Sequence, residues 1–208
     1  MYASGVAQEV IDKAKAFHGH WCGGLALGIR AAVWAMEHFG TANDEEIVTV
    51  TETDMCGVDA IQALVGCTLG KGNLLFRDTG KIAFTFYRRS DGKRLRIIAK
   101  VRGGELKNRI MELRERLGAM DISGEERRKL ETELRNLREQ DIEYVLSAPF
   151  EEIFDIKAPC HPMPPLAQRL PTIICEGCGE GVRGGIRHSG LGTHLPPHLR
   201  TIPVESGA

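Results

Sequence analysis

The sequence predicts an α+β fold, in which helices pack on a mixed or antiparallel sheet, extended by a helical hairpin and a small C-terminal zinc finger. Three observations support this class: apolar residues at helical spacing before residue 40, β-branched segments between residues 47 and 100, and a leucine repeat among charged residues from residue 105. The 208 residues suffice for one moderate domain with a small appendage. We expect a core over residues 1–157 that includes the hairpin at 104–147, a proline-rich linker at 158–171 and the finger at 172–208.

Two helices and a set of strands are expected in the first hundred residues. Apolar residues at helical spacing predict a first helix over 6–17 and a second over 25–39, which Gly40 ends. β-branched residues predict a strand over 47–52, and a short helix is expected over 59–67. Turn residues separate the remaining predicted strands, which lie over 74–76, 81–89 and 94–100.

The segment after residue 104 is typical of a helical hairpin. Its apolar residues recur at spacings of four and three, namely Leu106, Ile110, Leu113, Leu117 and Met120 in the first helix and Leu130, Leu134 and Leu137 in the second. Ser123 and Glu126 match a capping box that opens the second helix. The charges around this repeat indicate a solvated face, and an exposed hairpin of this kind is also suited to forming a homodimer.

Composition and charge exclude several classes of protein. The formal net charge is −1, so general binding of nucleic acid through a large positive charge is not expected. No apolar run is long enough to span a bilayer, and residues 1–5 have no basic start before an apolar stretch. We therefore expect a cytoplasmic protein that does not bind membranes.

Cysteines and histidines cluster near both ends of the chain. Six cysteines without an export signal favour metal binding over disulfides. Near the C-terminus the predicted zinc ligands are Cys175, Cys178, His194 and His198. Because Pro196 and Pro197 separate the two histidines, these do not lie on a regular zinc-finger helix, and His188 is a substitute ligand.

A second cluster lies near the N-terminus. His18, His20 and Cys22 alternate among glycines, and Cys22 directly precedes the second predicted helix, whose N-terminus would stabilise a thiolate. Cys56 follows a predicted strand, and Asp59 comes shortly after it. Two alternatives remain open: a transition-metal site, or a Cys22 nucleophile with His18 or His20 as its base. Cys56 could also be a buried structural cysteine.

Three segments of the chain together resemble the FmdE family, proteins similar to the FmdE component of formylmethanofuran dehydrogenase. They are the Phe17–Gly28 segment FHGHWCGGLALG, the Glu52–Gln62 segment ETDMCGVDAIQ and the Gly66–Leu74 segment GCTLGKGNL. The resemblance implies an α+β core that forms intertwined dimers, a zinc finger in some members, and operons of molybdenum or tungsten formylmethanofuran dehydrogenases in anaerobes.

The resemblance also implies the residues of the core site. His18, His20, Cys22, Cys56 and Asp59 would line it, with Gln62, Cys67 and Lys71 nearby. The chain departs from the family pattern twice. Gly23 stands where proline often follows the first cysteine, and His194 and His198 stand where the finger usually has a second cysteine pair.

These features favour a metal-binding accessory protein, with zinc in the finger and a second transition metal, zinc among the candidates, in the core. Its expected partners are a second copy of the chain and a molybdenum or tungsten enzyme or its assembly machinery. An enzyme that uses the core metal or Cys22 on a small substrate, with Cys22 and His20 as candidate catalytic residues, is the first alternative. A metal-sensing or nucleic-acid-binding regulator is the weaker one.

Overall fold

The computed structural model describes residues 6–119, 122–159, 161–167, 171–174 and 179–183. The chain divides into two compact units, one ending at Leu166 and the other beginning at Ala167. In the described part of the second unit, β6 (Thr172–Ile174) pairs antiparallel with β7 (Gly181–Arg183). The predicted zinc ligands Cys175, Cys178, His188, His194 and His198 lie outside the described residues.

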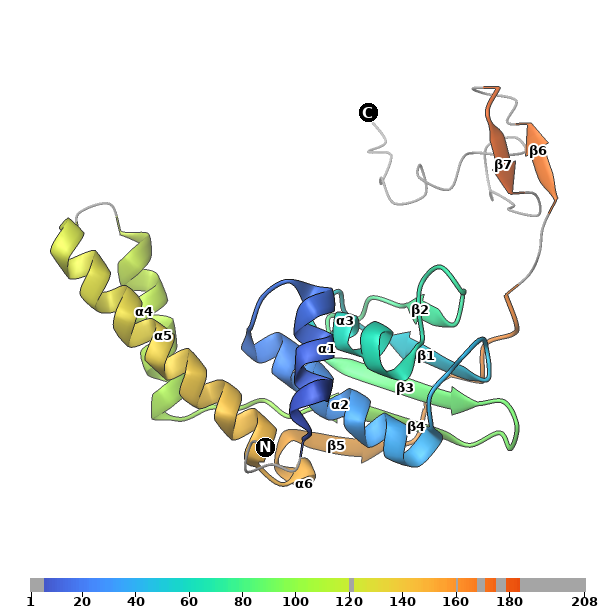
Figure 1. Ribbon diagram of the computed structural model, residues 1–208, viewed down its shortest axis with the longest axis horizontal. Helices are drawn as coiled ribbons and strands as arrows, with labels where there is room; N and C mark the ends of the chain where they lie inside the picture. The colour runs from blue at the N-terminus through green and yellow to red at the C-terminus, as the bar shows by residue number, and fades with distance from the viewer. Residues whose placement is uncertain (1–5, 120–121, 160, 168–170, 175–178, 184–208) are drawn as a thin grey trace, which may run out of the picture. The chain divides into compact units, whose positions relative to one another are not determined.

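The first unit is built on a mixed sheet, which within the described residues has five strands in the order β2-β1-β3-β4-β5 (Figure 1). The first four strands are β1 (Ile47–Thr51), β2 (Leu74–Phe76), β3 (Ala83–Arg88) and β4 (Arg94–Ala99). β1 pairs parallel with β2 and antiparallel with β3, and β3 pairs antiparallel with β4. β5 (Phe154–Lys157) then pairs antiparallel with β4, although the sequence did not predict this strand.

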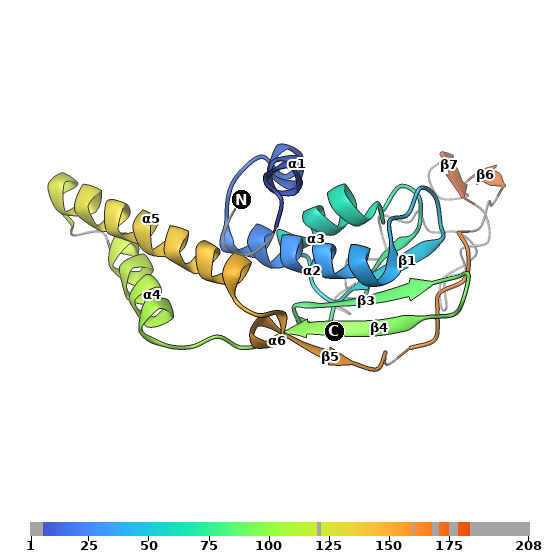
Figure 2. The ribbon, with the colours of Figure 1, turned by 60° about the horizontal axis from the view of Figure 1, so that its bottom comes forward.

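Helices cover one face of this sheet, as Figure 2 shows. α2 (Gly23–Phe39) is the central one, and it packs against α1 (Gln8–His18), the short α3 (Gly57–Ala60), the following π-helix η1 (Ile61–Val65) and β3. Most of its residues are buried, in keeping with a helix that is apolar on nearly all sides. This arrangement confirms the predicted α+β class.

The helical hairpin consists of α4 (Glu105–Gly118) and α5 (Gly124–Ser147). Ile110, Leu113 and Leu134 form its small core, so the predicted leucine seam is confirmed for its described members. Met120 lies outside the described residues. Ser123 caps α5 by accepting a hydrogen bond from the backbone N–H of Glu126 at 3.1 Å.

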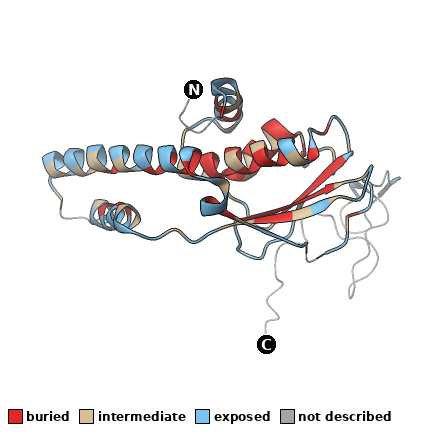
Figure 3. Ribbon diagram, turned by 90° about the horizontal axis from the view of Figure 1, so that it is seen from below, coloured by how far each residue is buried: buried red, intermediate tan, exposed pale blue. Residues whose placement is uncertain are grey.

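The C-terminal part of α5 belongs to the main core. Most residues of α5 are exposed along the hairpin, and several become buried near its C-terminal end (Figure 3). Arg30 of α2 anchors the helix end by donating hydrogen bonds to the carbonyl oxygens of Leu146 and Ala148, at 2.7 and 2.8 Å. The short α6 (Phe150–Ile153) follows and leads into β5.

Part of the predicted linker lies against the second face of the sheet. Tyr87 donates a hydrogen bond to the carbonyl of His161 at 3.0 Å, and Arg89 donates to the carbonyls of Pro164 and Pro165 at 2.9 and 3.0 Å. Met163 packs against the small cluster of Val48, Val50 and Tyr87. Residues 161–165 therefore pack on the core.

Candidate metal centre

The turn between α1 and α2 holds the first three residues of the site. His18 is the last residue of α1, and Gly19 ends that helix in the left-handed conformation, with φ +86°. Cys22 is the N-cap of α2, and its Sγ accepts a hydrogen bond from the backbone N–H of Leu25 at 3.3 Å. The sulfur therefore lies at the positive end of a 17-residue helix, where a thiolate is stabilised.

Cys56 reaches the same place because two glycines let α2 and α3 cross closely. A Cβ on Gly28 would lie 2.2 Å from the Cα of Gly57 and 2.3 Å from its carbonyl oxygen. One turn earlier, a Cβ on Gly24 would lie 3.1 Å from the Cβ of Cys56. No larger residue fits at the crossing without a backbone shift. Gly28 belongs to the Phe17–Gly28 motif of the sequence, but the motif does not indicate this role.

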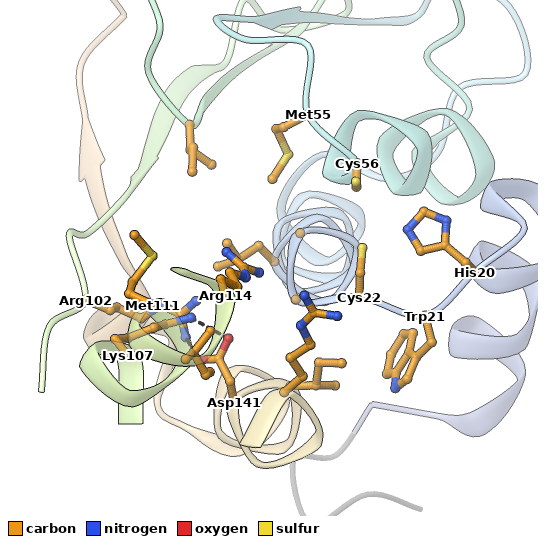
Figure 4. Close-up of a pocket in the computed structure, with 17 residues that line it drawn as sticks. His20, Trp21, Cys22, Met55, Cys56, Arg102, Lys107, Met111, Arg114 and Asp141 are labelled. Carbon is orange, nitrogen blue, oxygen red and sulfur yellow. Dashed lines mark hydrogen bonds and ion pairs between the residues drawn. The ribbon is translucent and has the colours of Figure 1, made fainter. Parts of the chain in front are cut away.

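The structure brings four of the five predicted core residues together. The donor atoms of His18, His20, Cys22 and Cys56 all lie within 4.8 Å of one another, and Figure 4 shows Cys22, Cys56 and His20 facing a common point. The Sγ of Cys22 lies 3.9 Å from the Nε2 of His18. In a tetrahedral zinc site with Zn–S near 2.3 Å and Zn–N near 2.0 Å, donor atoms are about 3.3–3.8 Å apart. The two nitrogens and two sulfurs therefore fit a tetrahedral ion after a small contraction.

Asp59, the fifth predicted residue, lies beside this group and holds one of its members. Its Oδ2 is 2.7 Å from the Nδ1 of His18, whose side chain is 9% exposed. A carboxylate accepts this hydrogen bond from Nδ1–H, so in the neutral form of the ring that can bind a metal the lone pair is on Nε2, the nitrogen nearer Cys22. Gln62 in turn donates to the Oδ1 of Asp59 at 3.3 Å. This is the outer-shell arrangement that orients histidine ligands toward metals.

The two thiols of the cluster influence each other. Burial raises the pKa of the Cys56 thiol, and its hydrogen bond with Cys22 and the charge of that neighbour raise it further. A cation bound between the sulfurs would reverse this effect, because a coordinating thiol is deprotonated.

Cys67 and Lys71 serve the fold around the site. Cys67 is fully buried, its Sγ donates to the carbonyl of Ile47 at 3.4 Å, and burial raises its pKa to about 11. Lys71 donates from its Nζ to the carbonyl oxygens of Ala42 and Asn43, at 3.3 and 3.2 Å. These contacts attach the segment after η1 to the start of β1 and to the loop before it.

A cavity of about 570 Å³ opens directly onto the cluster. His20, Cys22 and Cys56 line one side of it, and residues of the hairpin line the opposite side (Figure 4). Asp141, Arg102 and Lys107 are among the lining residues. Lys107 and Asp141 are among the charged residues of the hairpin that the sequence predicts to form a solvated face, because the charges of an amphipathic helix do not indicate what lies across a cavity from them.

Comparisons with known proteins agree with this geometry. The family model described as "FmdE, Molybdenum formylmethanofuran dehydrogenase operon" matches residues 17–155, a segment that contains all five core residues. A tungsten formylmethanofuran dehydrogenase FmdE-like protein from Syntrophus aciditrophicus shares the fold, with a TM-score of 0.51 and 21% identity over 85% of each chain.

A curated relative matches a shorter stretch. It is a probable S-adenosyl-L-methionine-binding protein from Archaeoglobus fulgidus, 41% identical over 95 residues. The match covers 43% of this chain and 26% of that protein, so the chain spans about a quarter of the relative's length. Among the described helices, none has the length and apolar composition needed to cross a bilayer. Because the family model matches the greater part of the chain, and the fold agrees with it, the protein belongs to the FmdE family.

Proposed function

We propose that this protein is a metal-binding accessory protein that serves a molybdenum or tungsten formylmethanofuran dehydrogenase or its assembly. The observation that carries the proposal is the set of two imidazole nitrogens and two cysteine sulfurs within 4.8 Å, held by the ends of α1, α2 and α3. A mixed set of nitrogen and sulfur donors is typical of zinc sites and excludes magnesium and calcium sites, which use oxygen. Zinc is therefore the ion that we expect in the core.

The four donors differ in how firmly they are held. His18 is oriented by Asp59, Cys22 by its capping hydrogen bond, and Cys56 by the close crossing of α2 and α3. His20 is exposed and follows the glycine that ends α1. We infer that His20 is the ligand that can leave the ion, which would open a coordination position for exchange with a partner or a substrate.

The proposal extends to the partners of the chain. The family model supports an association with the dehydrogenase system. A homodimer through the hairpin is supported by the apolar Met111, which is 54% exposed on α4. The C-terminal module is proposed as a structural zinc finger for protein contacts, with Cys175, Cys178, His194 and His198 as ligands and His188 as the substitute.

A second candidate function is an enzyme that acts on a small molecule at the same centre. The observation that favours it is the cavity of about 570 Å³, because Cys22 and Cys56 both reach its surface. Cavities of roughly 300–1,000 Å³ are typical of small-molecule sites. Under this interpretation the exposed His20 leaves the ion when substrate enters.

Metal analysis of the full chain tests the proposal. Protein purified without oxygen is analysed for metal per chain as wild type, as Cys22→Ser, and as the double variant Cys175→Ser/Cys178→Ser. We expect Cys22→Ser to lose one ion while its circular dichroism is unchanged, and the double variant to lose a different one. Cys67→Ser is the matched control, because this buried cysteine lies outside the cluster.

Retention of all the metal by a folded Cys22→Ser variant would refute the core metal site. Loss of turnover on a candidate substrate in Cys22→Ser, in protein whose metal content is intact, would instead support the enzyme.

A further inference from the structure

The cavity beside the metal centre carries an excess of positive charge on the side formed by the hairpin. Four cationic side chains line it, namely Arg102, Lys107, Arg114 and Arg138, and Asp141 is the carboxylate among the lining residues. The chain as a whole has a net charge of −1, so this local excess is not a consequence of composition. Cations gathered on one side of a concave site attract anions.

The buried carboxylate holds two of the four cations. The Oδ1 of Asp141 lies 2.9 Å from the Nη1 of Arg102, and its Oδ2 lies 2.5 Å from the Nζ of Lys107. The Asp141 side chain is only 9% exposed, so the pair of cations keeps a fixed position. One carboxylate cannot neutralise two cations, and one positive charge remains at this point.

The other two cations, Arg114 of α4 and Arg138 of α5, are exposed to the cavity. No described side chain forms an ion pair with either guanidinium. By contrast, Arg109 of the same helix α4 pairs with Glu133 at 2.7 Å, and Arg116 pairs with Glu126 at 2.8 Å. Two guanidinium groups that face one cavity can bind the oxygens of a carboxylate or phosphate in a bidentate manner.

Much of the remaining lining of the cavity is apolar. It includes the side chains of Trp21, Leu27, Met111, Ile82 and Ile142. A ligand that spans the cavity would therefore combine an anionic group with an apolar body. The cavity of about 570 Å³ is in the range of a drug-sized molecule and is too small for a folded macromolecule.

We propose that this cavity binds a small organic anion, whose carboxylate or phosphate group contacts Arg114 and Arg138 and whose apolar body extends toward Cys22 and Cys56. The binding of the anionic group does not depend on the metal. The approach of the ligand to the ion rests on the proposed function of the core centre.

Titration of the full-length protein with three probes tests the inference. Phenyl phosphate and benzoate carry the two candidate anionic groups on an apolar ring, and inorganic phosphate lacks the ring. Binding is followed by calorimetry and by the fluorescence of Trp21, since Trp34 is the other tryptophan and is 6% exposed. We expect at least one ring-bearing probe to bind more tightly than inorganic phosphate, and its identity tells carboxylate from phosphate ligands.

The variants locate the binding site. Arg114→Gln/Arg138→Gln should weaken binding by roughly tenfold to hundredfold, because hydrogen bonds to charged groups are lost. Arg135→Gln on α5 should leave binding unchanged, since this exposed arginine does not line the cavity. Both variants keep good helix formers at exposed positions, and circular dichroism verifies the fold.

Three results would overturn the inference: no probe binds at millimolar concentration, the double variant binds as well as wild type, or inorganic phosphate binds as tightly as both ring-bearing probes. Repeating the titration on Cys22→Ser and on chelator-treated wild type separates the two proposals. Arginine-dependent binding that persists in both proteins would support the anion site as independent of the metal. The same binding in wild type that is purified without a core metal would support the anion site and refute the metal centre. A protein that holds the core metal but binds none of the anionic probes would support the metal centre and refute the anion site.

Discussion

Replacing Gly28 with alanine tests whether the crossing of α2 and α3 assembles the metal centre. The added Cβ would lie 2.2 Å from the Cα of Gly57, whereas ordinary contacts begin at 3.4 Å, so the two backbones must separate by about 1.2 Å. The three nearest atoms to this Cβ all belong to the backbone of Gly57, so no side-chain rotation relieves the contact. Overpacking of this kind costs about 1–3 kcal/mol. Alanine in a helix interior gains about 1 kcal/mol over glycine, which offsets part of that cost.

Two assays measure the consequences of Gly28→Ala. Urea denaturation should show a net loss of up to about 2 kcal/mol in the free energy of unfolding. Competition with a chelating dye should show weaker metal binding, because a shift of α3 moves Cys56 away from Cys22. Gly118→Ala is the control, since nothing lies within 4 Å of a Cβ at that helical glycine and the change should be neutral or stabilising. A Gly28→Ala protein as stable as wild type, with undiminished metal affinity, would refute the reasoning.

Further changes test the surroundings of the site. Asp59→Asn should weaken metal binding by roughly tenfold to hundredfold, because His18 loses the carboxylate that orients it; unchanged affinity in the dye competition would contradict this. Cys67 has its pKa raised to about 11, so the unfolded chain loses that proton first and stability falls as the pH rises from 9 to 11. The free-energy difference between wild type and Cys67→Ala should therefore shrink by roughly 2 kcal/mol over that range, and a constant difference would argue against burial as the cause. Arg96→Met should cost about 3–5 kcal/mol, because it leaves the Glu52 carboxylate, whose side chain is 13% exposed, without its cation. Arg96 lowers the pKa of Glu52, so stability from this pair is present at neutral pH and is lost as the pH falls through the folded pKa; acid titration of wild type and Arg96→Met should show that difference.

Local patterns in the sequence were sufficient to predict α1, α2, the four strands from β1 to β4 and the hairpin, but not the short α6. The leucine seam could be predicted because residues three and four apart lie on one helix face. Ile110, Leu113 and Leu134 are buried together in the structure. The N-terminal cap of α5 could be predicted because the Ser123 side chain bonds the backbone N–H of Glu126 within one turn. The candidate metal residues were also identified, since cysteine and histidine among glycines are rare outside such sites.

Relations between distant segments required the tertiary structure. β5 pairs with β4 only after the chain returns from the hairpin, and its four residues carry too little local pattern to predict a strand. The role of Asp59 as the partner of His18, rather than one of the four clustered donors, depends on how α3 lies against the end of α1.

The order of residues along the chain was enough to indicate which side chains can hold a metal, because that depends on their chemistry and on short spacing. Only the tertiary structure shows that Cys22 and Cys56 lie close together. Their approach depends on two helix backbones that cross where Gly28 and Gly57 leave room. The same holds for the cavity. Its cations come from the hairpin and the segment just before it, and its cysteine sulfurs come from the helix ends. The packing of α5 against α2 brings these groups to one space.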